Sequence, residues 1–456
     1  MPYCRIKPAK SVLGEIDLPG DKSIAHRSII ISAIAKGKTY IYNFPASQDC
    51  LTTLKAFRRL GVKISKIGMT KKHINLCVAG RGLFGLNKPL TYIDVRESGT
   101  TARLILGVLA GQKFSATLTT QAESSLNNRP MRRITEPLRK MGAFIKARKS
   151  KPYAKMQDHA AEEYLPIAIK GGTLRSISYR IPVASAQVKS ALLLAGLYAK
   201  GTTKIFEPIK TRDHTERMLK DFKADMNVRD KIISIRGKKE LVSPGKIHIP
   251  GDISSASFFI IAAILLPHSR LVIKSVSLNP TRLGLIRVLK RMDANIKIIP
   301  ARCPSAEPMG DIIIKSSMLT GTRVRRSEIP QLIDELPILM LAASFARGRT
   351  VIDGVQELRV KETDRINSMQ TNLRQMGAQI NVVSHRLSSG RLKEELVIRG
   401  KEKLRGSIVS SFSDHRTAMS MVIAGLVSDS QMLIDNIGCI AKSFPGFLRV
   451  LRVLTK

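Results

Sequence analysis

Charged and polar residues gather at the predicted start of one apolar helix in a pattern that suits anion binding. The stretch Pro19-Gly-Asp-Lys-Ser23 leads through Arg27 into the apolar segment Ile29–Ala35. Gly20 permits a sharp turn, and Ser23 can cap the helix. Lys22 and Arg27 then lie beside the exposed N–H groups of the helix start, where the macrodipole favours negative charge. The alternative is an ordinary helix start with solvated charges.

A second copy of this turn lies more than two hundred residues later. Residues 249–259 repeat the Pro-Gly-Asp turn and the apolar helix, but without the Lys or the Arg. The same turn thus occurs twice, but only its first copy is followed by basic residues. This asymmetry predicts a two-part scaffold that carries a site.

Similar clusters of polar and charged residues recur at other predicted helix starts. Beyond the first, they are Glu97–Arg103, Asn128–Met131, Ser185–Gln187, Arg212–Glu216, Ile329–Pro337, Arg359–Arg365, Asp414–Arg416 and Ala441–Pro445. Each cluster alone is a weak signal, since such short motifs usually lie on the surface. Their matching places in a repeat predict that they serve one function.

Two alternating motifs define that repeat. The first is an apolar, Ala-rich helix, which is expected to be buried because it is apolar on nearly every side. Its copies are Ser23–Ala35, Ser98–Ala110, Ser185–Ala199, Ser254–Leu266, Ile329–Ala346 and Asp414–Val427. The second motif is an amphipathic helix that ends near a Gly-Ala pair and is followed by a strand.

Together the motifs predict an α/β protein of six βαβαββ-like units, divided three plus three. We expect domains at residues 21–247 and 248–456, with residues 1–20 packing with the second half. Buried helix starts from both halves should face one interdomain space that attracts anions.

Length and composition limit the class of protein. A chain of 456 residues with 43% hydrophobic and 24% charged residues should fold into at least two globular domains. We see no secretory signal and no apolar run of the roughly 18 residues that a membrane span needs. The five cysteines are scattered and never form C-x-x-C. We therefore expect a soluble cytoplasmic protein without a structural zinc site.

The net charge of +41 raises nucleic acid as a partner, because a basic face releases counterions on binding. The basic residues are spread along the chain, however, and there is no Trp and only 5% aromatic residues for base stacking. We therefore discount nucleic acid and keep an RNA binder or RNA-end cyclase as the alternative from another class.

As a set, the motifs resemble those of the 5-enolpyruvylshikimate-3-phosphate synthase family, the 3-phosphoshikimate 1-carboxyvinyltransferases. They are Pro-Gly-Asp-Lys-Ser-x-x-x-Arg27, Arg129-Pro-Met, Leu358-Arg-Val-Lys-Glu-Thr-Asp-Arg365 and Asp414-His-Arg416. Ser185-Ala-Gln and Arg212-Asp-His-Thr-Glu resemble the subset called class II. The resemblance extends from Lys7 to Pro445. It implies two domains, each of three inverted βαβαββ units with pseudo-threefold symmetry.

The resemblance also implies the reaction. The family transfers the enolpyruvyl group of phosphoenolpyruvate to the 5-hydroxyl of shikimate 3-phosphate and releases phosphate, without a metal or another cofactor. The expected partners are these two small substrates, with no membrane and no nucleic acid, and the protein is expected to be a monomer.

Site residues follow by resemblance, and the active site is expected in the interdomain cleft. Those for phosphoenolpyruvate are Lys22, Gly99, Arg129, Gln187, Arg365, Arg416 and Lys442. Those for shikimate 3-phosphate are Lys22, Ser23, Arg27, Ser185, Ala186, Gln187, Arg212, Asp334 and Lys361. The chemistry independently asks for such cations, because two substrates bring two phosphates and two carboxylates.

The reaction also needs one acid and one base, because C3 of the enol must gain a proton as the hydroxyl attacks C2. Asp334 is the candidate base and Glu362 the candidate proton donor, with Lys22 as a partner. The assignment of acid and base among these three stays open at this point. The alternative for the two carboxylates is a salt bridge to a neighbouring cation.

Two positions at the start of the second buried helix are notable. Many family members carry Asn where this chain has Glu97, whose carboxylate should turn away from phosphoenolpyruvate or pair, for example with Arg96. Gly99 matches the family glycine whose enlargement crowds the inhibitor glyphosate.

The nearest alternative is the sister enolpyruvyltransferase family that acts on UDP-N-acetylglucosamine. That family relies on a cysteine in the loop after its second buried helix, and residues 98–133 of this chain contain no cysteine.

Overall fold

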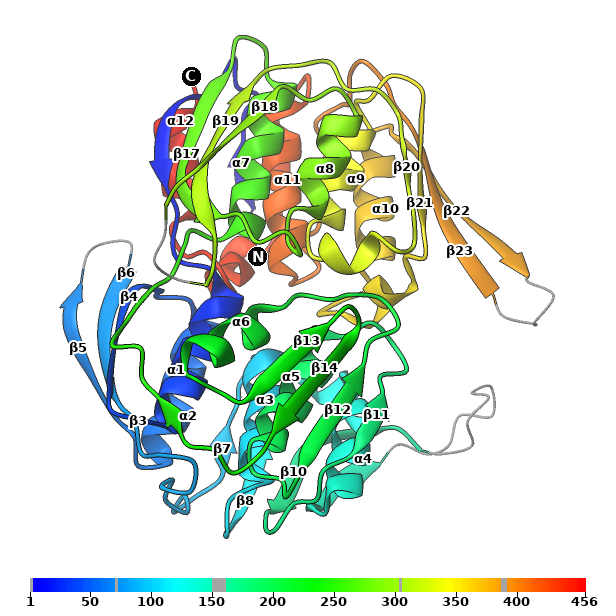
Figure 1. The fold of residues 1–456 in the computed structure, drawn as a ribbon. Coiled ribbons are helices and arrows are strands. Elements are labelled where there is room, and N and C mark those ends of the chain that lie inside the picture. The colour runs from blue at the N-terminus through cyan, green and yellow to red at the C-terminus, as the bar shows by residue number, and fades with distance from the viewer. Residues whose placement is uncertain (1–2, 70–72, 150–160, 303–305, 387–391) are drawn as a thin grey trace. The chain divides into compact units, whose positions relative to one another are not determined.

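The computed structural model describes residues 3–69, 73–149, 161–302, 306–386 and 392–456 (Figure 1). The chain forms two compact units. The N-terminal unit comprises Lys22–Ile249 and Pro304–Glu307, and the C-terminal unit comprises Met1–Asp21, Pro250–Cys303 and Pro308–Lys456. Each unit has its own apolar core.

Three buried helices form the centre of the N-terminal unit over its described residues: α1 (Lys22–Ala33), α3 (Gly99–Leu109) and α5 (Ala186–Gly196). In α1 every residue from Ile24 to Ala33 is buried. Amphipathic helices accompany them, namely α2 (Gln48–Arg59), α4 (Arg132–Met141) and α6 (His214–Asp221). The all-round apolar sequence of the first motif thus decides which helices are central.

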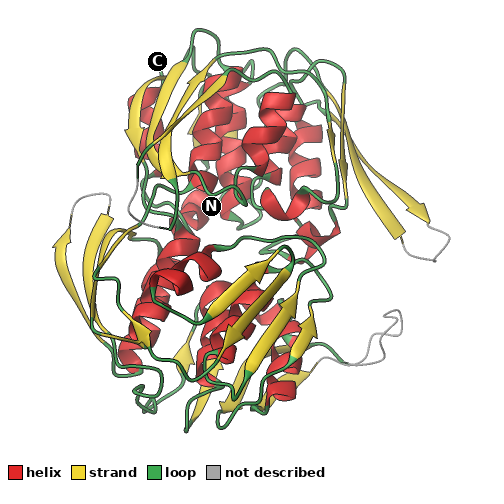
Figure 2. Cartoon of the chain, in the orientation of Figure 1, coloured by secondary structure: helices red, strands yellow, loops and turns green. Residues whose placement is uncertain are grey.

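Sheets surround these helices (Figure 2). Where the N-terminal unit is described, their strand orders are β16-β4-β6-β5, β7-β8-β10-β9 and β11-β12-β14-β13, with a small pair β15-β3. In each four-stranded sheet the first two strands are parallel and the other pairings antiparallel. The strands are β3 (Ala35–Lys36), β4 (Lys38–Pro45), β5 (Lys63–Met69), β6 (His73–Ala79), β7 (Ile93–Asp94), β8 (Ser115–Thr119), β9 (Phe144–Lys149), β10 (Glu163–Lys170), β11 (Ser178–Arg180), β12 (Thr202–Phe206), β13 (Met226–Arg229), β14 (Ile232–Arg236), β15 (Leu241–Val242) and β16 (Lys246–His248).

The C-terminal unit repeats this plan in its described part. Its buried helices are α7 (Ile253–Leu265), α9 (Leu336–Ala343) and α11 (His415–Val427), accompanied by α8 (Gly284–Arg291), α10 (Arg365–Gln375) and α12 (Phe447–Leu454). Its sheets have the orders β2-β17-β19-β18, β20-β21-β23-β22 and β24-β25-β1. The strands are β1 (Cys4–Ile6), β2 (Leu13–Asp17), β17 (Arg270–Ser277), β18 (Ile296–Pro300), β19 (Met309–Lys315), β20 (Arg323–Val324), β21 (Arg349–Asp353), β22 (Gln379–Arg386), β23 (Leu392–Arg399), β24 (Ile408–Val409) and β25 (Met432–Ile434).

The predicted fold class is confirmed: this is an α/β protein whose two units each repeat a βαβαββ pattern three times over the described residues. Each repeat pairs a parallel strand with an antiparallel hairpin, except that the last sheet has three strands. There the N-terminal strand β1 supplies the antiparallel partner of β25.

One predicted helix differs from the structure. Instead of a continuous helix over 329–346, the chain forms a short 3₁₀ helix η2 (Ile329–Gln331), a turn, and then α9. Pro337 explains the break, because its ring clashes with the carbonyl four residues earlier and it lacks an N–H. Asp334 consequently lies in a turn and not within a helix.

Three further 3₁₀ helices are found among the described residues: η1 (Ser125–Asn128), η3 (Gln356–Val360) and η4 (Ile437–Lys442). Of the helices that the structure describes, none has the length and apolar character to cross a membrane. Cys4, Cys50, Cys77 and Cys439 are free thiols, and Cys303 lies outside the described residues.

Candidate active site

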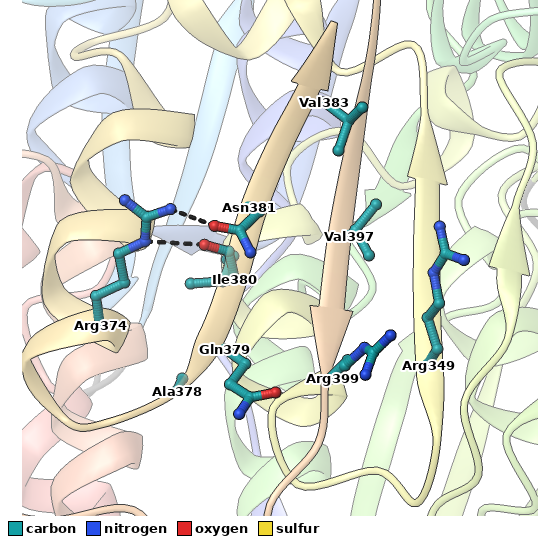
Figure 3. Close-up of a pocket in the computed structure, with 9 residues that line it drawn as sticks. All are labelled: Arg349, Arg374, Ala378, Gln379, Ile380, Asn381, Val383, Val397 and Arg399. Atoms are coloured by element: carbon teal, nitrogen blue, oxygen red, sulfur yellow. Dashed lines mark hydrogen bonds between the residues drawn. The ribbon is translucent and has the colours of Figure 1, made fainter.

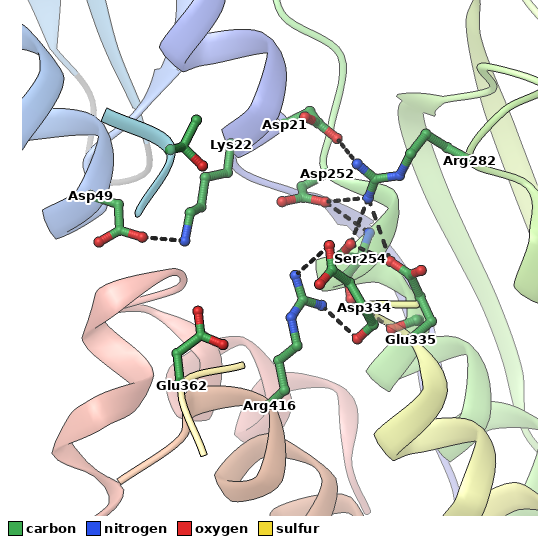
Figure 4. A network of polar contacts seen from close by, with 12 residues as sticks. Asp21, Lys22, Asp49, Asp252, Ser254, Arg282, Asp334, Glu335, Glu362 and Arg416 are labelled. Atoms are coloured by element: carbon green, nitrogen blue, oxygen red, sulfur yellow. Dashed lines mark hydrogen bonds and ion pairs between the residues drawn. The ribbon is translucent and has the colours of Figure 1, made fainter. Parts of the chain in front are cut away.

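Lys22 is the first residue of α1, so Ser23 is the second residue of the helix and does not cap it as predicted. Its ammonium forms an ion pair with the carboxylate of Asp49 on α2 (Figure 4). The side chains of Lys22 and Asp49 are only partly exposed. Sequence reasoning missed Asp49, although an acidic residue in the first turn of a helix was a visible signal.

Arg27 connects three helices of the N-terminal unit. Its Nε donates to Thr215 Oγ1 on α6 at 2.6 Å, its Nη2 to Ser190 Oγ on α5 at 2.8 Å, and its Nη1 to the carbonyl of Ser23 at 2.9 Å. Arg27 is buried. The structure thus brings together two predicted residues, Ser23 and Arg27. It adds Thr215, which lies in the motif Arg212–Glu216 but was not among the predicted site residues, and Ser190, for which the sequence carried no signal.

The start of α5 is held to the start of α3. Gln187 Oε1 accepts from Arg103 Nη1 at 2.9 Å, and Gln187 Nε2 donates to Thr100 Oγ1 at 3.0 Å. Ser185 caps α5 by accepting from the N–H of Val188, and Ala186 is the first residue of that helix. The predicted polar start of α5 therefore forms with its side chains ordered.

Gly99 opens α3 where guanidinium groups pack closely. A Cβ at Gly99 would lie 2.8 Å from Arg103 Nη1 and 3.0 Å from Arg129 Nη1. Arg103 also donates to the carbonyl of Pro130 at 3.2 Å, which ties the Arg129 segment to α3. The structure thus groups Gly99, Gln187 and Arg129 around Arg103, a residue that the predicted site did not include.

Glu97 has Ser125 as a partner. Its carboxylate accepts from the N–H of Ser125 at 3.2 Å and from the Ser125 hydroxyl at 2.8 Å. Arg96 pairs with Asp94, with Nε 3.9 Å from Oδ2. The carboxylate at this position therefore holds the start of η1, the short helix that precedes Arg129.

Arg365 is the centre of the predicted residues in the C-terminal unit. Its Nε donates to Asp414 Oδ2 at 2.8 Å, its Nη2 to Glu362 Oε2 at 2.5 Å, and its Nη1 lies 3.5 Å from Asp334 Oδ1. The side chain of Arg365 is 1% exposed. Although burial alone would lower the pKa of Arg365, the three carboxylates raise it, so the guanidinium stays charged.

Arg416 and Lys442 extend this cluster. Arg416 Nη1 donates to the backbone carbonyl of Asp334 at 2.9 Å, and its Nη2 lies 3.7 Å from Asp334 Oδ2 (Figure 4). Lys442 Nζ lies 3.5 Å from the carbonyl of Ser413, in the turn that leads to α11. The predicted residues Asp334, Glu362, Arg365 and Arg416 thus form one polar cluster with Lys442 near the turn behind it.

The charges of this cluster also affect the pKa of Lys361. Desolvation lowers the pKa of Lys361 to about 8, and the positive charge of Arg365 acts in the same direction. The carboxylates of Asp334, Glu357 and Glu362 oppose that shift. An amine with such a pKa changes its charge near neutral pH, as is common at functional sites.

A second buried guanidinium network, around Arg282, lies next to the Asp334 turn. Arg282 Nη2 donates to Ser254 Oγ at 2.6 Å and lies 3.4 Å from Glu335 Oε1, while its Nη1 lies 3.6 Å from Asp21 Oδ2 (Figure 4). Its Nη2 is also 3.8 Å from Asp252 Oδ1. Burial, and then the charge of Asp21, raises the pKa of Asp252 to about 6.

This network was missed at the sequence level. Asp252 belongs to the second Pro-Gly-Asp turn, which stood out only for lacking a Lys and an Arg. Arg282 supplies a cation there from a segment thirty residues later. The network holds Glu335, the neighbour of Asp334, and Asp21, the neighbour of Lys22.

The predicted site residues divide between the two units. The N-terminal unit contains Lys22, Ser23, Arg27, Gly99, Arg129, Ser185, Ala186, Gln187 and Arg212. The C-terminal unit contains Asp334, Lys361, Glu362, Arg365, Arg416 and Lys442. A cavity of about 610 Å³ lies elsewhere in the C-terminal unit, along β22 and β23 (Figure 3). Its lining, which includes Arg349, Arg374 and Arg399, contains no predicted site residue.

Known proteins match the chain over nearly its whole length. Residues 6–451 match the family model of EPSP synthase (3-phosphoshikimate 1-carboxyvinyltransferase). A 3-phosphoshikimate 1-carboxyvinyltransferase of Desulforamulus reducens is 44% identical over 447 residues, covering 98% of both chains. Another, of Geotalea uraniireducens, is 45% identical over 446 residues, covering 98% of this chain and 97% of the relative.

Solved structures agree with these sequence matches. The EPSP synthase of Acinetobacter baumannii superimposes with a TM-score of 0.83 at 39% identity, covering 100% of this chain and 98% of that one. The enolpyruvyl transferase NikO of Streptomyces tendae shares the fold, with a TM-score of 0.73 at 15% identity, covering 99% of this chain and 97% of that one. With the family model, these matches decide the assignment: the chain belongs to the EPSP synthase family of 3-phosphoshikimate 1-carboxyvinyltransferases.

Proposed function

We propose that this enzyme transfers the enolpyruvyl group of phosphoenolpyruvate to the 5-hydroxyl of shikimate 3-phosphate and releases phosphate. The family assignment supports the reaction. The observation that carries the chemistry is the buried guanidinium of Arg365, which contacts the carboxylates of both Asp334 and Glu362. One fixed cation thereby orients the two groups that the reaction needs as base and acid.

The substrates are proposed to bind through residues of both units. Phosphoenolpyruvate would be held by Arg129, Arg365, Arg416 and Lys442, with Lys22, Gly99 and Gln187. Shikimate 3-phosphate would be held by Ser23, Arg27, Ser185, Ala186, Gln187, Arg212 and Lys361, with Lys22 and Asp334. Two doubly acidic substrates favour this concentration of Arg forks and Lys point charges.

The chemistry is proposed as an addition followed by an elimination. Asp334 takes the proton of the 5-hydroxyl group as the hydroxyl oxygen bonds to C2 of phosphoenolpyruvate. Glu362 gives a proton to C3, with Lys22 as partner in proton transfer. In the second step C3 gives a proton back to Glu362 and the double bond re-forms, while the C2–O bond to phosphate breaks and Asp334 gives its proton to the departing phosphate. Atoms balance without any further reactant, and each carboxyl group returns to its starting state.

The setting of the enzyme is also a proposal. We propose that it works as a monomer in the cytoplasm. Four free thiols among the described residues fit a reducing compartment. Size-exclusion chromatography with light scattering tests the monomer, and a dimer mass at micromolar concentration would reject it.

A phosphate-release assay tests the reaction directly. We expect release only when both substrates are present, with the enolpyruvyl ether as the second product by mass spectrometry. Release from phosphoenolpyruvate alone, or no release with both substrates, would contradict the proposed function.

A further inference from the structure

One lysine and two glutamates form a buried ionic triad in the N-terminal unit. Lys189 Nζ on α5 lies 3.1 Å from Glu207 Oε2, in the segment after β12, and 2.5 Å from Glu216 Oε1 on α6. The side chains of Lys189, Glu207 and Glu216 are 1%, 2% and 5% exposed. The triad thus joins three separate elements of the chain.

Lys189 is charged in this setting. Burial alone would lower its pKa, but Glu216 and Glu207 raise the pKa above its usual value. A buried ion cluster is expensive to desolvate and is often no more stabilising than apolar residues of the same volume. Its presence therefore calls for a role other than stability alone.

The first link leads from the triad to Arg212. Glu207 uses Oε2 for Lys189 and Oε1 for Thr211, accepting from the Thr211 N–H at 3.1 Å and from the Thr211 hydroxyl. Thr211 is 2% exposed and directly precedes Arg212. Lys189 therefore orients the Glu207 carboxylate, and this carboxylate holds the backbone at Thr211, next to Arg212.

The second link leads to Arg27. Ser190, the neighbour of Lys189, and Thr215, the neighbour of Glu216, both accept hydrogen bonds from the Arg27 guanidinium. Their two hydroxyl oxygens lie 2.7 Å apart. By joining α5 to α6, the ion pair of Lys189 and Glu216 sets the spacing of the two hydroxyls that orient Arg27.

We propose that Lys189 is a positioning residue for shikimate 3-phosphate: through Glu207 and Glu216 it holds Arg212 and Arg27 in the arrangement that receives this substrate. The inference rests on the proposed function, in which these two arginines bind shikimate 3-phosphate. The triad should therefore affect shikimate 3-phosphate more than phosphoenolpyruvate, since the cations proposed for phosphoenolpyruvate alone stand on other elements. Arg129 follows η1, Arg365 is the first residue of α10 and Arg416 the second of α11.

The test compares two variants with one control by steady-state kinetics, each substrate varied while the other is saturating. Lys189→Met removes the shared cation, and Thr211→Val removes one hydroxyl at nearly constant volume. We expect the KM for shikimate 3-phosphate to rise at least about tenfold in Lys189→Met and several-fold in Thr211→Val, from the loss of buried polar contacts. The KM for phosphoenolpyruvate should stay within about twofold of wild type.

Glu163→Gln is the matched control. Glu163 is a buried carboxylate of the same unit that accepts from Thr135 Oγ1 at 2.5 Å and Arg139 Nη1 at 2.9 Å. Its replacement should lower the melting temperature without moving the KM for shikimate 3-phosphate. Calorimetric titration of shikimate 3-phosphate into each folded variant, checked by circular dichroism, gives the same comparison without turnover.

The outcomes separate the two proposals. A wild-type protein without activity on both substrates rejects the proposed function. An active wild type whose Lys189→Met and Thr211→Val variants raise both KM values equally, or neither, rejects the positioning role. If Lys189→Met does not fold, Thr211→Val decides the question in the same way.

Discussion

Arg365 and Glu362 form a hydrogen bond of 2.5 Å between residues three positions apart, across the start of α10. Asp364 caps that helix between them by accepting from the N–H groups of Ile366 and Asn367. The local helix start therefore presents Glu362 to a guanidinium that is already fixed by Asp414. We propose that this contact fixes the position of the Glu362 carboxyl group for its part in proton transfer.

Replacing Glu362 by Gln should lower kcat by at least about a hundredfold with little change in either KM. The amide still accepts from Arg365 but has no proton to exchange. Glu394→Gln is the control, because Glu394 pairs with Arg359 in the same unit at 2.9 Å. Stopped-flow or steady-state phosphate release measures the rate, and a Glu362→Gln enzyme with more than a tenth of wild-type kcat would exclude Glu362 as the acid.

Replacing Gly99 by Ala should raise the KM for phosphoenolpyruvate roughly three- to tenfold. The new Cβ would displace the guanidinium ends of Arg103 and Arg129 by a few tenths of an ångström, an overpacking cost of about 1 kcal/mol. Gly172→Ala is the control, since a Cβ there meets nothing within 4 Å.

Glyphosate extends the Gly99 prediction. We expect it to compete with phosphoenolpyruvate in the wild type and to inhibit Gly99→Ala less. An unchanged KM for phosphoenolpyruvate in Gly99→Ala would contradict the steric argument, and a wild type that millimolar glyphosate does not inhibit would contradict the competition.

Binding of shikimate 3-phosphate should weaken above pH 8. Desolvation lowers the pKa of Lys361 to about 8, so its ammonium loses the proton, and its attraction for phosphate, as the pH rises through that value. The KM for this substrate should rise by up to about tenfold per pH unit above 8. Lys361→Arg keeps the charge and should flatten the rise. The same rise in both enzymes would show that another group titrates.

The stability of the C-terminal unit should fall as the pH rises from about 4 to about 6. Burial and the charge of Asp21 raise the pKa of Asp252 from 3.8 to about 6, so in this window the folded protein binds more protons than the unfolded chain. The contribution is fully present below pH 4 and is lost above 6, at most about 3 kcal/mol. In Asp252→Asn, thermal unfolding should lack this fall. A parallel fall in wild type and variant would refute the assignment.

The repeats and the site motifs could be predicted because they depend on local physics. A helix that is apolar all round must be buried, and both Pro-Gly-Asp turns of this chain lead directly into a helix, α1 and α7. The six buried helices, the α/β class and the residues at their starts followed from these signals and from the family resemblance. The position of Asp334 did not, because Pro337 ends the helical path that hydrophobicity alone suggested.

Only the tertiary structure decided which residues share a partner. Arg365 meets Asp334 and Asp414 from distant segments, and Arg27 meets Ser190 and Thr215 more than 160 residues away. No spacing rule connects such positions, because contacts of this kind arise when separate helices pack and their buried polar groups must find partners. The amino-acid sequence by itself determined where most of the buried helices start, with α9 as the exception, and which charges stand near those starts. Packing decided that Lys189 and Arg282, unremarkable in the sequence, became the buried cations around which those charges are ordered.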